Sequence, residues 1–531
     1  MNETFLKAWT DGLIKCSAVA MVAAALSACA WLDPNGQRPK PVIVQDLDVN
    51  VMNEVFVKGF GEIKERAFDD PDLDKLFMAG LAGLKTIDPD VQVKPVQDNN
   101  LSAFYKGREI ITLGPQSKPD IPAWSFATLR TLIAARKVST ALRAADEEAL
   151  YKAIFAAAVS TIDPYSHYAN RIDAAGLRLV REGVIGLGAR LELADDGALV
   201  KAIVNDGPAG NAGLKLNDVI VQANGVSLKN RQLADVRHRL DGVAGTTVNL
   251  TVRRAGERNP LIVPVALDLV VPDTVTGNVK DSILELGVRA FNQRTASAVE
   301  NAVTEARRDG KLKGIVLDLR GNTGGLLDQA IDIADLFLDK GTIITLHGRN
   351  SGANQFYTAQ PGDVAEGLPI AVIVDGKSAS AAEIVAAALQ DNHRAAVVGT
   401  VSWGKGSVQT IRRLPNSGEL TMTWARVTTP RGAALHGLGL MPNVCLSGER
   451  ASATEAINRM MAGTSRNDDI QRRWHAPADD PNIHEALRAD CPAETRGGRA
   501  LDLEVARQIV GNPMLLARAI PDGAPQLAAR P

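Results

Sequence analysis

The chain contains few of the side chains that bind metal ions. Among its 531 residues are four cysteines and seven histidines. No CxxC pair and no cluster of cysteine with histidine occurs in the sequence, and structural zinc sites need such groupings. We therefore expect no metal ion and no other cofactor.

The chain also lacks an excess of charge of either sign. Its 59 lysine and arginine residues nearly balance its 61 aspartate and glutamate residues, and the formal net charge is −2. Basic residues form no long run, whereas binding to nucleic acid requires a concentrated basic face. Nucleic acid is therefore excluded as a partner. The 45% content of hydrophobic residues is enough for the cores of several globular domains.

The apolar run near the N-terminus is too short for a transmembrane helix and is typical of a signal peptide. Lys7 and Lys15 precede this run, which occupies residues 16–28, whereas a membrane-spanning helix needs about 20 apolar residues. The run ends in the letters "LSAC", whose last residue is Cys29. This ending resembles the bacterial lipobox, in which the cysteine is lipidated and becomes the new N-terminus once the signal peptide is removed.

Lipidation of Cys29 would hold the mature protein on a membrane surface. Several acyl chains on one cysteine bind a bilayer far more durably than a single chain does. Ala30, rather than an aspartate, follows the cysteine, which favours the outer membrane. We therefore expect a lipoprotein in the periplasm. An uncleaved anchor or a chance cysteine is the alternative.

The two remaining cysteines, Cys445 and Cys491, predict a disulfide bond. Cys16 is lost with the signal peptide, Cys29 carries the lipid, and the periplasm is oxidising. The bond would fasten the C-terminal extension to the preceding domain and would contribute about 4 kcal/mol in the chain-entropy description. Two free, buried thiols are the alternative.

Changes in sequence pattern divide the chain into six segments. They are a signal peptide (1–28), a lipidated tether (29–44), a mainly helical N-terminal domain (45–172), a β-rich domain (173–270), an α/β core (271–445) and a C-terminal extension (446–531). Apolar residues recur at helical spacing in the third segment, and short alternating runs between turn signals mark the fourth. Apolar strands alternate with helical stretches in the fifth segment, which indicates a layered core. The expected fold class is a multi-domain α+β protein with an α/β core.

Polar turns that contain glycine or serine follow the two most apolar strands of the core, "GIVLDL" and "IAVIVD". In layered α/β proteins, chemistry gathers at such strand ends. After the second strand, "GKSAS" opens a helix, where Ser378 fits a helix cap. Ser380 is expected one or two positions inside that helix, beside N–H groups that can hold an oxyanion. The motif is not G-x-S-x-G, which disfavours an α/β-hydrolase with a Ser-His-Asp triad.

A serine nucleophile needs a base, and the histidines are poor candidates. His393 lies at the far end of the same helix, about 18 Å away, and His167 and His436 have no supporting motif. Lys405, in "VSWGKGSV", can take a proton only when it is neutral, and burial among apolar and glycine residues lowers the pKa of a lysine. Gln409 can fix the amine by a hydrogen bond without adding charge.

Two other roles for Lys405 stay open at this point. The spacing of Gly399, Gly404 and Lys405 matches a nucleotide-binding P-loop, but Gly406 stands where that motif has a hydroxyl that binds magnesium. The second role is that of a solvated surface residue, because most lysines in proteins are exposed to solvent.

Four motifs together closely resemble the carboxyl-terminal processing peptidases, or tail-specific proteases, of the S41 type. They are "GIVLDLRGNTGGLLDQAIDIADLFL", "GKSASAAEIVAAALQD", "VVGTVSWGKGSVQT" and "DPYSHY", and the resemblance covers residues 45–445. It implies a serine endopeptidase with a Ser-Lys dyad. Ser380 would be the nucleophile, Lys405 the base and Gln409 the supporting residue.

The same resemblance places the oxyanion hole and suggests a role for two charged residues. The oxyanion donors would be the N–H of Ala381 and the N–H of Gly324 or Gly325. Asp318 and Arg320 look structural, because they would organise the loop "RGNTGG".

The β-rich segment resembles a PDZ domain. The resemblance rests on "GPAGNAGLKLNDVIVQANG" at residues 207–225 and on Gly186, Leu187, Gly188 and Ala189, whose backbone N–H groups would capture a C-terminal carboxylate. It implies protein substrates with exposed C-terminal tails as partners. An adaptor protein and a second copy of the chain are further candidate partners. The alternative function is a PDZ-bearing lipoprotein scaffold whose protease core is latent, and a nucleotide binder is a third.

Overall fold

The structure is a computed structural model. It describes residues 47–96, 100–114, 120–204, 207–448, 452–462, 467–478 and 480–520. The expected signal peptide and Cys29 lie outside the described residues. Across these ranges no helix is both long and apolar enough to cross a membrane, and His, Cys, Asp and Glu residues form no cluster that could hold a metal ion.

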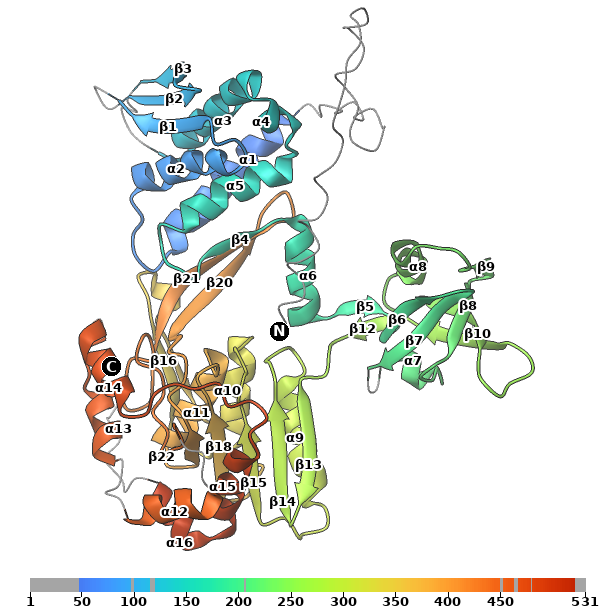
Figure 1. Ribbon diagram of the computed structural model, residues 1–531, viewed down its shortest axis with the longest axis vertical. Coiled ribbons are helices and arrows are strands. Elements are labelled where there is room, and N and C mark those ends of the chain that lie inside the picture. Colours follow the sequence, from blue (N-terminus) through green and yellow to red (C-terminus); the bar gives the residue numbers. More distant parts are fainter. Residues whose placement is uncertain are drawn as a thin grey trace, which may run out of the picture. The chain divides into compact units, whose positions relative to one another are not determined.

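The N-terminal region is mainly helical, as its apolar spacing predicts. Its elements are α1 (Val49–Arg66), α2 (Leu73–Ala82), the 3-10 helix η2 (Gly83–Thr86), β1 (Val91–Pro95), β2 (Leu101–Tyr105), β3 (Arg108–Leu113), α3 (Ile121–Val138), α4 (Thr140–Ala144) and α5 (Glu147–Val159) (Figure 1). Aspartates cap the four longest helices, because each side chain accepts backbone N–H groups of the first turn: Asp48, Asp72, Asp120 and Asp146. Phe56, Phe60 and Phe155 pack together in the core.

The β-rich segment forms a five-strand antiparallel path in the order β11-β10-β8-β7-β6, to which β9 adds beside β8. Its elements are β5 (Val184–Gly186), β6 (Ala189–Ala194), β7 (Gly197–Ile203), α7 (Pro208–Asn211), β8 (Val219–Ala223), β9 (Val226–Ser227), α8 (Leu233–Leu240), β10 (Thr247–Arg253), β11 (Leu261–Ala266) and β12 (Asp268–Val270). The chain enters through β5 and leaves through β12, which pair with each other. The helix α6 (Arg171–Glu182) occupies the first residues of the segment expected to be β-rich.

The core contains a six-stranded sheet in the order β13-β14-β15-β18-β19-β22, in which only the β13–β14 pair is antiparallel. Its elements up to the nucleophile loop are β13 (Val275–Lys280), β14 (Ile283–Val288), α9 (Thr295–Arg307), β15 (Gly314–Asp318), α10 (Leu327–Leu336), β16 (Thr342–His347), η4 (Ser351–Ala353), β17 (Gln355–Thr358) and β18 (Ile370–Val374). The remaining elements are α11 (Ala381–Asp391), β19 (Ala396–Gly399), β20 (Ser407–Arg413), β21 (Glu419–Thr428) and β22 (Val444–Cys445).

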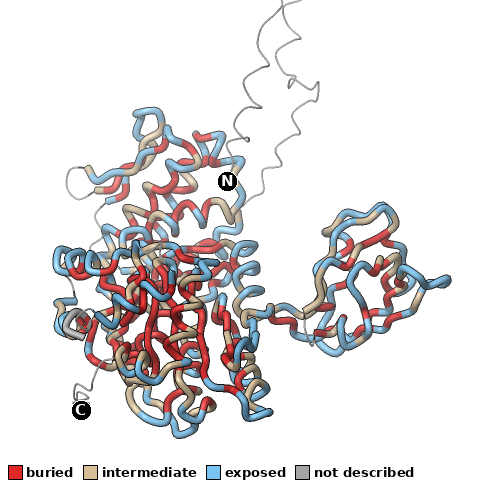
Figure 2. Tube along the Cα trace, turned by 60° about the horizontal axis from the view of Figure 1, so that its bottom comes forward, coloured by how far each residue is buried: buried red, intermediate tan, exposed pale blue. Residues whose placement is uncertain are grey.

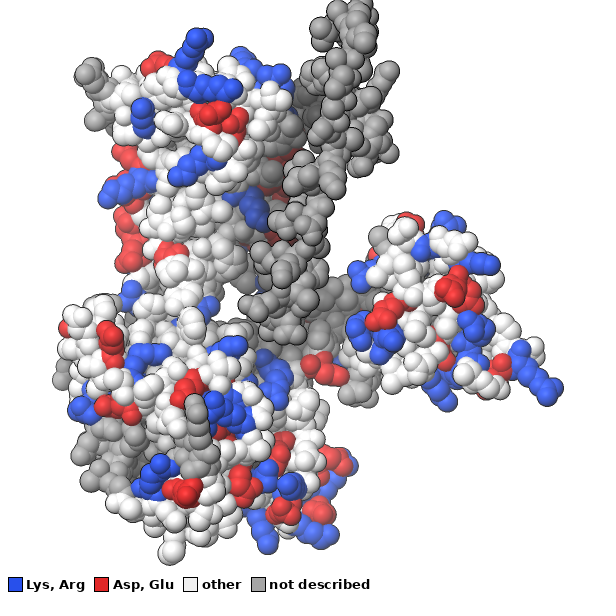
Figure 3. Space-filling view, viewed as in Figure 1, with Lys and Arg blue, Asp and Glu red and all other residues white. Residues whose placement is uncertain are grey.

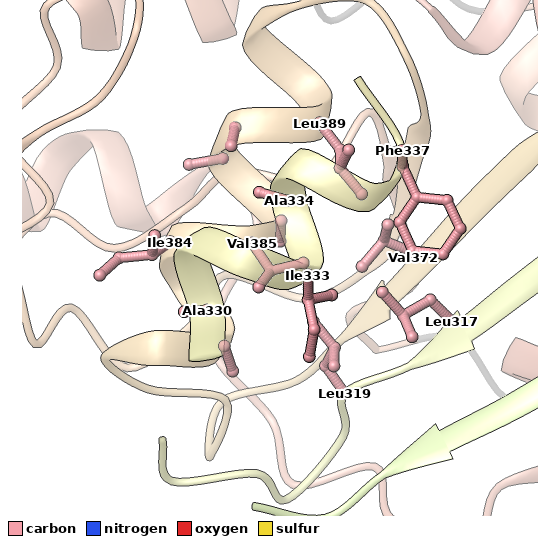
Figure 4. Packing of buried hydrophobic residues seen from close by; sticks show 14 of the residues in the cluster. Leu317, Leu319, Ala330, Ile333, Ala334, Phe337, Val372, Ile384, Val385 and Leu389 are labelled. Atoms are coloured by element: carbon pink, nitrogen blue, oxygen red, sulfur yellow. The ribbon is translucent and has the colours of Figure 1, made fainter. Parts of the chain in front are cut away.

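Both faces of this sheet are covered, which explains the continuous apolar runs of its central strands. Leu317 and Val372 point toward α10 and α11 (Figure 4), and their neighbours Val316 and Ile373 join a second cluster. That second cluster contains Ala506 and Val510 of the C-terminal extension, which therefore supplies one layer of the core. Figure 2 shows the central strands as a continuous buried zone.

A second sheet, in the order β17-β16-β21-β20, connects the core with the N-terminal helices. The strand β4 (His167–Ala169) pairs with β21. Leu414, Leu420 and Met422, from the β20–β21 hairpin, are buried in the same cluster as the aromatic residues of α1 and α5.

The C-terminal extension is helical and is linked to the core by the expected disulfide. Its elements are α12 (Ala453–Ala462), α13 (Asn467–Trp474), α14 (Pro481–Ala489), α15 (Ala500–Gly511) and α16 (Pro513–Ala519). Cys445 at the end of β22 and Cys491 after α14 form the bond. On the face drawn in Figure 3, basic and acidic side chains are interspersed rather than gathered by sign.

Candidate active site

Three loops meet at one edge of the large sheet. They follow the parallel neighbours β15, β18 and β19, and comprise residues 319–326, 375–380 and 400–406. Parallel strands that are neighbours end at the same edge, so the sheet itself brings "RGNTGG", "GKSAS" and "VSWGKG" together.

Ser380 precedes α11 instead of lying inside it. The helix begins at Ala381, and Ser380 is its N-cap with φ +57° and ψ −118°. A non-glycine residue with positive φ is strained, and such strain concentrates at functional sites. The sharp turn from β18 into α11 therefore presents the Ser380 side chain in an elbow, although the G-x-S-x-G motif is missing. The expectation that Ser380 sits one or two positions inside the helix is wrong.

Ser378 does not cap α11, which corrects its expected role as a helix cap. Its Oγ accepts a hydrogen bond from Asp375 N–H at 2.9 Å and donates one to Leu319 O at 2.8 Å. Ser378 therefore ties the nucleophile loop to the loop that follows β15.

Glu383 links the backbone of Ser380 to the backbone of Lys405. Its Oε2 accepts the N–H of Ser380 at 2.8 Å and the N–H of Lys405 at 2.9 Å. Its Oε1 accepts the N–H of Gly404 at 2.8 Å and the hydroxyl of Ser402. One carboxylate oxygen shared by both N–H groups makes the two backbones neighbours, although the residues are 25 positions apart in the sequence.

Glu383 is fully buried, and this burial raises the pKa of its carboxyl above the usual value. Three of its four hydrogen-bond partners are backbone N–H groups, which can only donate, and the fourth is the Ser402 hydroxyl. From the sequence alone we expected no functional role for Glu383. The signal that points to it is the capping-box spacing Ser-x-x-Glu, from Ser380 to Glu383.

The Lys405 side chain is half-buried, and burial lowers the pKa of its amine, while Asp163 and Glu383 oppose that shift. Its Nζ lies over the ring of Tyr165, 5.2 Å from the ring centroid. After the loop that holds Lys405 the chain continues as the strand β20. A P-loop leads into a helix, so the nucleotide-binding interpretation of this spacing is excluded.

Gln409 lies on β20 and bonds to residues other than Lys405. Its Nε2 donates to Ser407 Oγ at 3.0 Å and to Thr423 Oγ1 at 3.1 Å. Within the described ranges, Lys405 Nζ forms a hydrogen bond neither with Gln409 nor with Ser380 Oγ. The structure thus brings Ser380 and Lys405 together through their backbones, with the amine resting on an aromatic ring.

The expected oxyanion donors flank Ser380. Gly324 packs against it so closely that a Cβ there would lie 2.9 Å from Ser380 Cβ, which explains the need for glycine at φ +104°. The Gly324 N–H, however, already donates to Asn322 Oδ1 at 2.8 Å. Among the described residues, neither Ala381 N–H nor Gly325 N–H has a hydrogen-bond acceptor, so these two groups are available to an oxyanion.

The C-terminal extension binds the loops at this sheet edge. Arg496 N–H donates to Asp375 Oδ2 at 2.8 Å, and Gly376 N–H donates to Glu494 O at 2.8 Å. The guanidinium of Arg320 donates two hydrogen bonds to Asp318 and also donates to Asp502 of α15. These contacts agree with a structural role for Asp318 and Arg320.

The β5–β6 turn carries the residues expected to bind a C-terminal tail. Gly186 ends β5, Ala189 begins β6, and Gly188 has φ +75°. The carbonyls of Leu187 and Gly188 accept the N–H groups of Ala209 and Val204, which fixes the turn. Because β6 is the last strand of its sheet, its outer edge can pair with an added peptide strand.

Comparisons with known proteins point to one family for the core and one for the β-rich domain. The model of peptidase family S41 matches residues 282–446, and the PDZ domain model matches residues 186–265. A carboxy-terminal-processing protease of Bartonella bacilliformis is 36% identical over 304 residues, which cover 56% of this chain and 70% of that protein. A probable CtpA-like serine protease of Staphylococcus aureus is 32% identical over 318 residues, and the match spans 59% of this chain and 63%, less than two thirds, of that protein. Among solved structures, the photosystem II D1 C-terminal processing protease is 23% identical with a TM-score of 0.39, covering 75% of this chain and 94% of that one.

Proposed function

Because the chain belongs to peptidase family S41 and contains a PDZ domain, we propose that it is a serine endopeptidase that binds exposed C-terminal tails. In this proposal Ser380 is the nucleophile and Lys405 is the general base. The observation that supports it most directly is the single oxygen of Glu383 that accepts both backbone N–H groups. The sheet brings the two loops to one edge, and this oxygen fixes the backbones of Ser380 and Lys405 beside each other there.

The proposed reaction follows from these positions. Ser380 Oγ attacks the scissile carbonyl while Lys405 Nζ takes the hydroxyl proton, and the N–H groups of Ala381 and Gly325 stabilise the oxyanion. Lys405 then gives the proton to the leaving amine as the C–N bond breaks. Water hydrolyses the acyl-enzyme by the reverse sequence of proton transfers. The amine can accept the first proton because burial lowers its pKa.

Tail recognition is assigned to the PDZ turn at Leu187 and Gly188. An unfolded reporter protein with a free, apolar C-terminus should be cleaved faster than the same reporter with an amidated C-terminus, because amidation removes the carboxylate that the backbone N–H groups bind. Cleavage followed by gel electrophoresis, with peptide binding followed by fluorescence anisotropy, checks this. Equal rates for both reporters would contradict tail recognition. Tail binding without any cleavage would support the PDZ-bearing scaffold.

Membrane anchoring through Cys29 is a separate proposal, supported by the lipobox-like ending of the apolar run. Cells that are fed a labelled fatty acid should incorporate the label into the wild-type chain but not into Cys29→Ser, and fractionation should move that variant from the membrane to the soluble periplasm. Label that persists in Cys29→Ser would rule out this anchor.

A further inference from the structure

The ring of Tyr165 forms part of the surroundings of the Lys405 amine. Lys405 Nζ lies 5.2 Å from the centroid of this ring, within the distance at which a cation is attracted to an aromatic face. Tyr165 comes from the turn before β4, far from the loop of Lys405 in the sequence. Its ring also meets the ring of His436 edge-on, at 6.0 Å between centroids.

The turn that carries Tyr165 is held rigidly. Asp163 Oδ1 accepts the N–H of Tyr165 at 2.7 Å and the N–H of Ser166 at 2.9 Å. Ser166 Oγ donates to Asp163 Oδ2 at 2.7 Å and accepts Thr423 N–H of β21 at 3.1 Å. These hydrogen bonds fix the turn that carries the Tyr165 ring to β21 of the second sheet.

We propose that Tyr165 is a positioning residue that acts through Lys405: its ring holds the side chain in the site and stabilises the ammonium that forms when Ser380 loses its proton. The proposal rests on the proposed Ser-Lys chemistry. During acylation the Ser380 O–H bond breaks, its proton moves to Lys405 Nζ, and the Oγ–C bond forms as the carbonyl electron pair moves to oxygen. Positive charge thus appears on Nζ where the negative face of the ring already lies.

Several charged or titratable groups surround Lys405 besides Tyr165. Asp163 and Glu383 raise the pKa of its amine, and burial lowers it. The ring of His436 meets the Tyr165 ring edge-on, and the guanidinium of Arg488 on α14 donates to Leu438 O near Gly404. All of these groups stay in place when only the ring at position 165 changes, so a pair of variants at this position isolates its effect.

The experiment compares Tyr165→Leu with Tyr165→Phe, which keeps the aromatic face. The pKa of Lys405 is measured in a Ser380→Ala background from the pH dependence of its labelling by an amine reagent, read by mass spectrometry. Removing a group that favours the charged form should lower this pKa in Tyr165→Leu and leave it unchanged in Tyr165→Phe. In the active background, at a pH above the Lys405 pKa of every variant, Tyr165→Leu should reduce kcat about 5- to 30-fold with little change in KM, and Tyr165→Phe should retain the parent rate.

The labelling measurement does not depend on turnover, so failure of this inference and failure of the proposed function are distinguishable. An unchanged or raised pKa in Tyr165→Leu overturns the inference even if the enzyme is active. A Tyr165→Leu protein that cleaves faster than the parent at a pH where Lys405 is neutral in both proteins overturns it as well. If Tyr165→Leu does not fold, phenylalanines with one, two and three ring fluorines at this position weaken the negative face stepwise at nearly constant shape. A stepwise fall in pKa then supports the inference, and a flat series overturns it.

Discussion

Replacing Ser380 with alanine should lower kcat/KM for a tailed substrate by about four to six orders of magnitude, and Lys405→Ala should have an effect of similar size. The expected loss is this large because a nucleophile and its base act as a unit, and removing either leaves only binding and the oxyanion donors. Lys405→Arg is the matched variant: it keeps a cation near Tyr165, but a guanidinium cannot give up its proton in a protein. Initial rates of reporter cleavage measure all three.

The pH dependence provides a second measurement on Lys405. Burial lowers the pKa of the amine from its usual value of 10.5, and the amine accepts a proton only above that pKa. Activity should therefore rise with pH as Lys405 becomes neutral, and the midpoint of the rise should lie below 10.5. A rate that is flat from neutral to alkaline pH, with chemistry limiting, would contradict the assignment of the base.

Two outcomes would remove Ser380 or Lys405 from the mechanism. Substantial activity in Lys405→Arg would show that some other group takes the proton. Parent-level activity in Ser380→Ala would show that Ser380 is not the nucleophile. The affinity for a tail peptide serves as the control, because none of the substituted residues belongs to the PDZ domain and the peptide should bind each variant as it binds the parent.

The core could be predicted from the sequence because its signals are local and repeated. The strand runs "GIVLDL" and "IAVIVD" are apolar at every position except Asp318 and Asp375, which requires cover on both faces, and the structure gives them that cover. The family resemblance then assigned Ser380 as the nucleophile and Lys405 as the base. The resemblance did not predict the helix that covers the second face of the sheet, because α15 in the C-terminal extension carries no motif.

The structural features that could not be predicted from the sequence depend on backbone geometry or on contacts between distant residues. The hairpin β2–β3 turns at Lys106 and Gly107, both with positive φ. Its strands are short, and neither the mostly buried β2 nor the mostly exposed β3 shows a clear alternation. The positive φ of Ser380 likewise could not be predicted from the residues "KSASA". An acidic residue in the first turn of a helix, such as Glu383, usually only complements the helix dipole.

Glu383→Gln should be the most damaging substitution that leaves Ser380 and Lys405 intact. Four donors converge on the two oxygens of Glu383. Glutamine replaces one oxygen by an NH₂ group, which faces either the N–H of Gly404 or the N–H groups of Ser380 and Lys405 in a fully buried site, so at least one donor loses its acceptor. We expect the free energy of unfolding to fall by about 1–3 kcal/mol, since each buried donor without an acceptor costs about this much.

The loss of activity in Glu383→Gln should exceed what the loss of stability explains. Glutamine lacks the negative charge that strengthens the hydrogen bonds to Ser380 and Lys405, so the two loops can separate, and a displacement of about 1 Å at a reacting pair costs about 100-fold in rate. We expect kcat to fall by at least that factor at a temperature where the variant is fully folded, while the affinity for a tail peptide stays at the parent value. Thermal denaturation and steady-state kinetics measure the two effects separately.

Asp328→Asn is the matched control for Glu383→Gln, because Asp328 is also an acid in the first turn of a helix beside the site, but it is exposed. Loss of the Asp328 charge should lower the free energy of unfolding only by the helix-dipole contribution of about 0.3–1 kcal/mol, and kcat should stay unchanged. Glu383→Asp keeps the charge but shortens the reach by one methylene, so it should restore the charge balance without restoring both loop contacts and should fall between parent and Glu383→Gln. A Glu383→Gln protein with the parent kcat would mean that the shared carboxylate does not hold the nucleophile and the base together.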